Sequence, residues 1–244
     1  MNRKANIFAK TLFFHNQIAK YFCYGCELGL ISPIKKGIKN SKYFIEYARN
    51  RTFELCANEI LNNNLKGDVA EAGVAFGDFA SIINAYFPDK NLYLYDTFKE
   101  FNLAEMEYEI SNSFITKQNM KRLSKIFKQS GTSEITDKIK KKMKAPDKCV
   151  FRIGYFPETA QVDGDKIFSF VSIDLDLYKP IYNAIMFFYP RLEQGGYIFI
   201  HDYNSLDGLD GVKRAVTDAE KILGHFSKVP VPDNGGTLVI TKPL

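Results

Sequence analysis

The chain has 244 residues, a length that suits one α/β domain with an extension better than two full domains. Hydrophobic residues make up 45%, enough for a sizeable core, and the formal net charge is +5. That charge is concentrated in residues 117–148, where eleven Lys and Arg face three acidic residues, so the chain as a whole is not typical of a nucleic-acid binder. The basic segment is either a solvated helix surface or a contact site for a phosphate-bearing or acidic substrate.

Residues 1–65 are predicted to form an N-terminal helical extension, with its clearest helix from Tyr43 to Leu65. Charged side chains interrupt the apolar stretch from Ile7 to Pro33, so we expect neither a membrane span nor a signal peptide there. We expect these helices to pack on the core or to join copies of the chain in a homo-oligomer, with packing on a membrane surface as the alternative. Four cysteines have no zinc-type spacing, and we interpret them as reduced thiols of a cytoplasmic protein: Cys23, Cys26, Cys56 and Cys149.

Residues 66–244 alternate between strand and helix patterns, which indicates a doubly wound, mostly parallel α/β sheet. The predicted strands are 69–72, 92–95, 150–153, 167–173 and 197–200, and the predicted helices are 79–87, 181–189 and 212–223. Residues 97–147 show no strand pattern and are too long for a plain loop, so we expect a helical lid insertion. Segments 226–231 and 237–241 flank a Pro-Asp-Asn-Gly-Gly turn and predict a terminal antiparallel hairpin.

A glycine-containing loop follows the first predicted strand. Gly73 allows a sharp turn, and Gly77 allows the next helix to pack close to the strand. Ala75 stands where a dinucleotide-binding loop has its middle glycine, so an adenosyl group fits better than a pyrophosphate. Glu71 can meet a positively charged part of a ligand. A tight turn without a ligand is the alternative.

Asp96 ends the second predicted strand, about twenty residues after the glycine loop. A carboxylate at this place can accept hydrogen bonds from both hydroxyls of a ribose. The alternative is that Asp96 caps the start of a helix.

Acidic and metal-capable side chains follow the fourth and fifth strands: Asp174, Asp176, His201 and Asp202. Carboxyl ends of neighbouring parallel strands meet at one edge of a sheet, where ligands bind. Such a cluster repels itself unless a cation or a proton lies among its members. The alternative is a set of solvated carboxylates at strand ends.

Taken together, these motifs resemble the macrocin O-methyltransferase (TylF) family, whose members methylate sugar hydroxyls using S-adenosylmethionine. The matching segments, within residues 51–215 and in the right order, are Gly67–Val74, Tyr95–Phe98, Gly154–Thr159, Ile173–Tyr178, Leu192–Gly196 and His201–Tyr203. The resemblance implies a Rossmann-like class I methyltransferase fold, with a reversed strand at the sheet edge. The acceptor would be a glycosyl-bearing small molecule, with or without a phosphate group.

The same resemblance implies the roles of individual residues. The expected cofactor contacts are Glu71, Gly73, Val74, Gly77, Asp96, Thr97, Gly154, Phe156 and Asp174. The implied ligands of a divalent metal, Mg²⁺ or Mn²⁺, are Asp174, His201 and Asp202. Asp176, two residues beyond Asp174 on the same side of an extended chain, would take the proton from the acceptor hydroxyl.

His201 departs from the family pattern, which has an aspartate at this position. Imidazole suits Mn²⁺, Fe²⁺ or Zn²⁺ better than Mg²⁺. One alternative is therefore a methyltransferase that works without metal, with His201 as the base acting on a phenol or an acid. Another is a cofactor-binding interaction module without catalysis.

Overall fold

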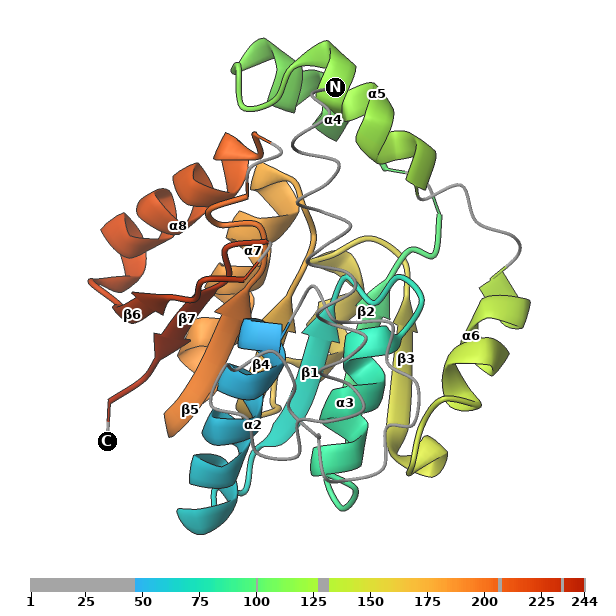
Figure 1. Ribbon diagram of the computed structural model, residues 1–244, viewed down its shortest axis with the longest axis vertical. Coiled ribbons are helices and arrows are strands. Elements are labelled where there is room, and N and C mark those ends of the chain that lie inside the picture. Colours follow the sequence, from blue (N-terminus) through green and yellow to red (C-terminus); the bar gives the residue numbers. More distant parts are fainter. Residues whose placement is uncertain (1–46, 100, 127–131, 206–207, 234, 244) are drawn as a thin grey trace, which may run out of the picture.

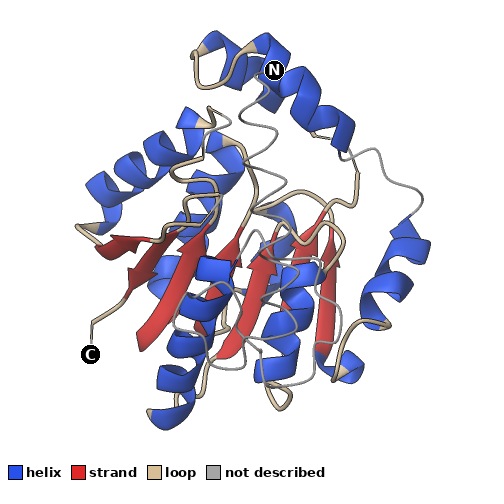
Figure 2. Cartoon of the chain, in the orientation of Figure 1, coloured by secondary structure: helices blue, strands red, loops and turns tan. Residues whose placement is uncertain are grey.

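The computed structural model describes residues 47–99, 101–126, 132–205, 208–233 and 235–243. Its seven strands form one sheet in the order β3-β2-β1-β4-β5-β7-β6 (Figures 1 and 2). The strands are β1 (Asp68–Ala72), β2 (Leu92–Asp96), β3 (Cys149–Ile153), β4 (Phe168–Ile173), β5 (Leu192–Ile200), β6 (Ser227–Pro230) and β7 (Leu238–Thr241). The first five pair in parallel, whereas β7 runs antiparallel to both β5 and β6. The predicted doubly wound sheet and its closing hairpin are confirmed.

Helices cover both faces of the sheet and its carboxyl-end edge (Figure 1). They are α2 (Tyr47–Asn62), α3 (Asp78–Tyr86), α4 (Leu103–Ser111), α5 (Lys117–Ile126), α6 (Thr132–Lys140), α7 (Tyr178–Arg191) and α8 (Asp210–Leu223), with 3₁₀ turns η2 (Pro146–Lys148) and η3 (Glu158–Asp163). Apolar residues of α2, α3 and α6 form one buried cluster against the sheet. Those of α7 and α8 form a second cluster on the other face.

The strands alternate between these two clusters, as the period of two in a strand requires. In β2, Leu92 and Leu94 pack in the cluster of α2 and α3. Tyr93 and Tyr95 pack in the cluster of α7 and α8. Because both faces are covered, these strands are apolar on both sides.

The 97–147 segment contains three described helices that differ in their surroundings. Figure 1 shows α4 and α5 beyond the carboxyl ends of the parallel strands, where a lid would lie. By contrast, α6 packs beside the sheet, with Ile135 and Ile139 buried in the cluster of α2 and α3. A Cβ atom on Gly77 would lie 2.7 Å from the Ile139 side chain, so the glycine allows this close packing. Closure of the segment over a ligand stays a prediction.

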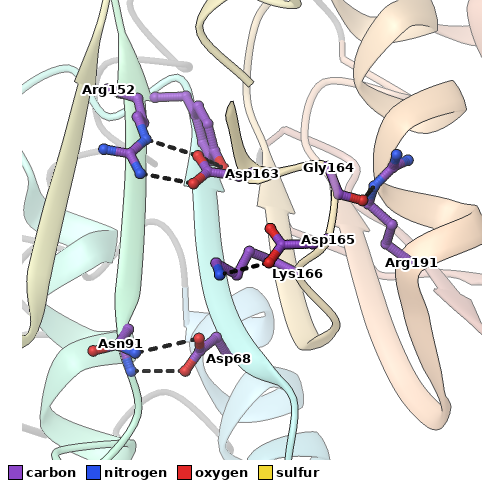
Figure 3. A network of polar contacts seen from close by, with 9 residues as sticks. Asp68, Asn91, Arg152, Asp163, Gly164, Asp165, Lys166 and Arg191 are labelled. Carbon is purple, nitrogen blue, oxygen red and sulfur yellow. Dashed lines mark hydrogen bonds and ion pairs between the residues drawn. The ribbon is translucent and has the colours of Figure 1, made fainter. Parts of the chain in front are cut away.

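A buried polar network joins β2, β3 and η3. Asp163 is 1% exposed and accepts two hydrogen bonds of 2.7 Å from the Arg152 guanidinium (Figure 3). The Tyr95 hydroxyl donates a third, at 2.9 Å. Every carboxylate oxygen of Asp163 thus has a partner.

Most of the predicted extension, residues 1–46, lies outside the described residues, together with Cys23, Cys26 and the predicted oligomer contacts. Its described end, α2, packs on the sheet: the centre of the Phe53 ring lies 4.8 Å from the centre of the Phe170 ring in β4. Cys56 and Cys149 are free cysteines. No helix in the described part of the chain is long and apolar enough to cross a membrane.

Candidate active site

The glycine loop passes very close to the end of β4. Gly73 has a φ of 88°, and a Cβ atom there would lie 1.9 Å from the Asp174 carbonyl oxygen. No side chain fits in that space, so this position requires glycine for both its conformation and its contact. The close approach brings Asp174 against the loop that follows β1.

Asp96 fastens this loop to the end of β2. One carboxylate oxygen accepts backbone hydrogen bonds from Val74 and Ala75, at 2.7 and 2.8 Å, and the other accepts one from Phe98 at 2.7 Å. Burial raises the pKa of Asp96, and these backbone N–H groups oppose that shift. No described helix begins next to Asp96, so the capping alternative is wrong. A carboxylate has further lone pairs, and the side chain also lines a pocket.

The first of two pockets, here called the Asp96 pocket, lies between the strand ends and the start of α4. It is lined by Gly73, Ala75, Tyr95, Asp96, Thr97, Lys99, Phe101, Asn102, Glu105, Gly154, Tyr155, Phe156, Asp174, Leu175, Asp176 and Pro180. Its wall is largely apolar, with carboxyl groups at Asp96, Glu105, Asp174 and Asp176. Lys99 is its one lysine or arginine among the described residues. Lys140, Lys141 and Lys142, which belong to the basic segment 117–148, line neither pocket.

The second pocket, here called the Glu71 pocket, adjoins the first at the glycine loop, where the two share Gly73, Ala75 and Asp174. It is lined by Arg49, Asn50, Glu71, Gly73, Val74, Ala75, Phe76, Asp78, Phe79, Ile82, Asp174 and His201. Glu71 is 2% exposed, and its Oε2 atom has no hydrogen-bond partner in the described structure. Burial raises the pKa of Glu71 well above its ordinary value, although the positive charge of Arg49 opposes the shift.

Arg49 of α2 is the counter-charge of this region and was missed by sequence reasoning. Arg49 is 5% exposed. Its guanidinium lies 3.4 Å from the Asp174 carboxylate and 3.1 Å from the Ser172 hydroxyl. It also lies 4.1 Å from the centre of the Phe79 ring. A signal existed in the sequence: Arg49 precedes Phe53 by four residues, which places a charge on the apolar stripe of the helix.

The predicted acidic cluster forms around one histidine nitrogen. His201 Nδ1 lies 3.1 Å from the Asp174 Oδ1 and 3.0 Å from the Asp202 Oδ2. The other nitrogen, Nε2, faces Gly235, where a Cβ atom would lie 2.2 Å away. Burial disfavours charge on both Asp174 and His201, but their attraction outweighs it. The pKa of Asp174 is lowered to about 2, and that of His201 is raised well above its ordinary value.

Asp176 lies beside this group and is hydrogen-bonded to Asp202. Burial, followed by the negative charges of Asp202 and Asp174, raises its pKa well above the ordinary value. The chain here is not extended as predicted: Asp176 has a φ of 60°, because the chain turns sharply before α7. Asp202 also has a φ of 60°. Left-handed conformations of non-glycine residues cost on the order of 1 kcal/mol each and concentrate at functional sites.

The donor atoms of Asp174, His201 and Asp202 fit a divalent cation. They lie within 4.8 Å of one another. An octahedral ion with bonds of about 2.1 Å has neighbouring ligands about 3 Å apart, close to the two separations measured from His201 Nδ1. Two carboxylates and one imidazole form a mixed set that Mn²⁺ accepts more readily than Mg²⁺. Asp174 belongs both to this cluster and to the two pockets.

The structure gathers most of the predicted cofactor residues at the two pockets. Six line the Asp96 pocket: Gly73, Asp96, Thr97, Gly154, Phe156 and Asp174. Glu71 and Val74 line the other pocket. Gly77 lines neither and lies under Ile139. Of the four predicted metal and base residues, Asp176 and His201 line different pockets, and Asp202 lines neither.

Known proteins are similar to this chain in sequence and in fold. Demethyldecarbamoylnovobiocin O-methyltransferase of Streptomyces niveus is 22% identical over 170 residues, or 67% of this chain and 63% of the relative. The chain thus spans less than two thirds of that relative's length. The structure of the O-methyltransferase NovP has a TM-score of 0.69 at 17% identity, and covers 84% of both chains.

Two structures of the calicheamicin methyltransferase CalS11 are also similar, both at 15% identity. The first has a TM-score of 0.64 and covers 93% of this chain and 90% of its own. The second, of the apo form of this TDP-rhamnose 3′-O-methyltransferase, has a TM-score of 0.54 and covers 93% and 92%. At this identity, these likenesses show the fold.

A family model settles the relationship. The model of macrocin-O-methyltransferase (TylF) matches residues 40–231, from α2 to the end of β6. That range holds the glycine loop, both pockets and the whole acidic cluster. Gly235, which faces His201, lies just outside it. The chain belongs to the macrocin-O-methyltransferase (TylF) family.

Proposed function

We propose that this protein is an S-adenosylmethionine-dependent O-methyltransferase that acts on a hydroxyl of a sugar or a glycosylated small molecule. Family membership supports the reaction. The observation that carries the proposal is the junction of the two pockets at Gly73, Ala75 and Asp174. A bent cofactor with two polar ends would span this junction, with its reactive centre beside Asp174.

The two pockets suit the two ends of the cofactor. We assign the adenosyl end to the Asp96 pocket, where the Asp96 carboxylate meets the ribose hydroxyls. The amino-acid end carries an ammonium and a carboxylate, and the Glu71 pocket offers a buried carboxyl group and the Arg49 guanidinium. A hydrogen-bonding carboxyl group and a guanidinium can together recognise the two charged groups of such a zwitterion.

We further propose that Asp174, His201 and Asp202 hold a divalent metal. When bound, that ion would lower the pKa of the acceptor hydroxyl and fix its position. Asp176 would take the proton, because its carboxyl lines the Asp96 pocket beside the cluster.

A metal-free enzyme with His201 as the base is the second candidate, which the geometry favours less. His201 Nδ1 lies between two carboxylates and Nε2 faces Gly235. Neither nitrogen lines the Asp96 pocket, whereas Asp176 does. A binding module without catalysis would have no use for two carboxylates held in left-handed conformations at strand ends.

Calorimetry with S-adenosylhomocysteine tests the cofactor assignment. We expect micromolar-range binding by the unchanged protein and none of NAD. Asp96→Ala should lose roughly 1.5–3 kcal/mol of binding free energy, as expected for buried charge-assisted hydrogen bonds. Asp89→Ala removes an exposed acid of the turn before β2, at the opposite end of that strand from Asp96, and serves as the control. Unchanged affinity in Asp96→Ala would sink the ribose assignment.

Three further expectations stay proposals. We propose a cytoplasmic location, oligomer contacts through the N-terminal helices of residues 1–65, and an acceptor that carries phosphate. Within the described residues, Lys99 is better placed than Lys140, Lys141 or Lys142 to meet such a phosphate, because it lines the Asp96 pocket.

A further inference from the structure

A buried glutamate outside the site connects α4 to both loops that carry the acidic cluster. Glu109 lies in α4 and is 1% exposed. Its Oε1 accepts a 2.6 Å hydrogen bond from the backbone N–H of Tyr178. Tyr178 is the first residue of α7, which begins two residues after Asp176. The glutamate therefore fixes the point at which the Asp174–Asp176 loop becomes a helix.

The other oxygen of Glu109 faces α8. Oε2 has no hydrogen-bond partner in the described structure. A Cβ atom on Gly211, the second residue of α8, would lie only 2.5 Å from it. The Gly211 backbone has no positive φ that would require glycine. A glycine inside a helix costs about 1 kcal/mol relative to alanine, so this glycine is explained by the space that the carboxyl group occupies.

A backbone link beside Glu109 supports the same connection. Phe114 donates its N–H to the Glu109 carbonyl oxygen at 2.9 Å, and its own carbonyl accepts the N–H of Asp210 at 3.0 Å. Asp210 is the first residue of α8, the helix that follows the His201–Asp202 loop. The Tyr108 ring stacks on that of Tyr178 at 5.7 Å. The end of α4 thus contacts the first turns of both helices.

We propose that Glu109 is a positioning residue that joins α4 to the first turns of α7 and α8, and so holds the two cluster-bearing loops at a fixed separation. The inference deepens the proposed function and rests on it, because the loops matter only if the cluster acts on a ligand. It also links the cluster to the Asp96 pocket, since Glu105 of α4 lines that pocket one turn away. Loosening Glu109 should therefore weaken ligand binding without removing any ligand contact.

Two variants of Glu109 separate the hydrogen bond from the charge. Glu109→Ala removes the acceptor, and we expect the Kd for S-adenosylhomocysteine to rise about tenfold. Glu109→Gln keeps an amide oxygen for the Tyr178 N–H, and we expect it to bind within about twofold of the unchanged protein. Burial already raises the pKa of Glu109 to about 7, so a neutral side chain is tolerated there. Glu107→Ala, in the same helix but exposed, is the matched control.

Gly211 tests the connection from the opposite side. Gly211→Ala should displace the carboxyl group and weaken binding. The same change in the Glu109→Ala background should have a much smaller effect, because the carboxyl group is gone and only the 3.2 Å approach to the Tyr178 Cβ atom remains. Additive losses would overturn the proposal. So would Glu109→Ala binding as tightly as Glu107→Ala, or Glu109→Gln failing like Glu109→Ala.

Hydrogen exchange in the protein without ligand keeps the inference separate from the proposed function. Glu109→Ala should speed exchange at the first turn of α7 and in α4, and Glu109→Gln should restore the protection. If the unchanged protein binds no S-adenosylhomocysteine, the cofactor assignment fails. The hydrogen-exchange measurement still tests whether Glu109 positions α4 and α7. Unaltered exchange in Glu109→Ala would overturn its positioning role. If Glu109→Ala does not fold, Glu109→Gln and Gly211→Ala carry the same comparison.

Discussion

Two groups of buried carboxylates differ in how well their charges are satisfied. Asp163 accepts three hydrogen bonds, from Arg152 and Tyr95, and no second carboxylate contacts it within the network of Figure 3. The acidic cluster gathers Asp174, Asp176 and Asp202 around His201, with two of these residues in left-handed conformations. The Asp163 network joins β2, β3 and η3, and the acidic cluster follows β4 and β5 of the same sheet.

The difference separates a structural network from a functional site. This buried, hydrogen-bonded ion pair fixes η3 against the sheet. Asp163 is buried and lines neither pocket, so the network is not placed to meet a ligand. Carboxylates that repel one another store free energy that a cation, a proton or a substrate can release. The comparison predicts that changes in the Asp163 network alter stability, whereas changes in the acidic cluster alter chemistry.

The largest expected effect is that of metal removal on the cluster. Methyl transfer to a panel of nucleotide sugars and glycosides, followed with labelled S-adenosylmethionine, should vanish with a chelator and return with Mn²⁺ at least as well as with Mg²⁺. His201→Asp makes the ligands all oxygen and should shift the preference towards Mg²⁺. Full activity after exhaustive chelation, together with an inactive His201→Asp variant, would favour His201 as a metal-free base.

Asp176→Asn should lower the transfer rate by about 10²–10⁴-fold, as expected for loss of a general base. Binding of Mn²⁺ and of S-adenosylhomocysteine should stay unchanged. The melting temperature should not fall, because one of the repelling carboxylates has been neutralised. The matched control is Asp165→Asn, which changes an exposed aspartate. A variant with the full rate would remove Asp176 from the mechanism.

Asp163→Ala should show the opposite pattern. Removing one partner of a buried ion pair leaves the other unpaired, and we expect a loss of about 2–4 kcal/mol in the free energy of unfolding, since Arg152 is partly exposed. The transfer rate of the folded fraction should change little. Urea unfolding and kinetics measured on the same samples check this. If the rate falls far more than the stability, the network belongs to the site.

Glu109 is intermediate, with one oxygen satisfied and one not. Burial raises its pKa from 4.5 to about 7, so the folded chain keeps a proton that the unfolded chain releases between these values. Its contribution to the free energy of unfolding is therefore present at low pH and falls as pH rises from about 4.5 to 7, by at most about 3 kcal/mol. Glu109→Gln should make the free energy of unfolding less dependent on pH in this range than Glu107→Gln does. Parallel curves for the two variants would contradict the shifted pKa.

The sequence predicted the sheet and its order of elements because buried parallel strands are apolar runs and helices have a different period. The strands predicted at 69–72 and 92–95 occur at Asp68–Ala72 and Leu92–Asp96. The helix predicted at 181–189 spans Tyr178–Arg191. The predicted start is too late because the sequence pattern places Pro180 at the end of a loop, whereas proline is favoured in the first turn of a helix. The adjacency of Asp174 and His201 followed from the parallel order of β4 and β5.

Contacts between distant segments were decided only by the tertiary structure. Arg49 precedes Asp174 by 125 residues, and Glu109 precedes Tyr178 by 69. Periodicity reports which side of its own element a residue occupies, but not which distant group lies opposite. By itself, the sequence determined the fold class, the glycine loop and the carboxylates at the strand ends. Folding decided which cation balances those carboxylates, which helix fixes their loops, and which of them faces a pocket, because these depend on how separate elements pack in space.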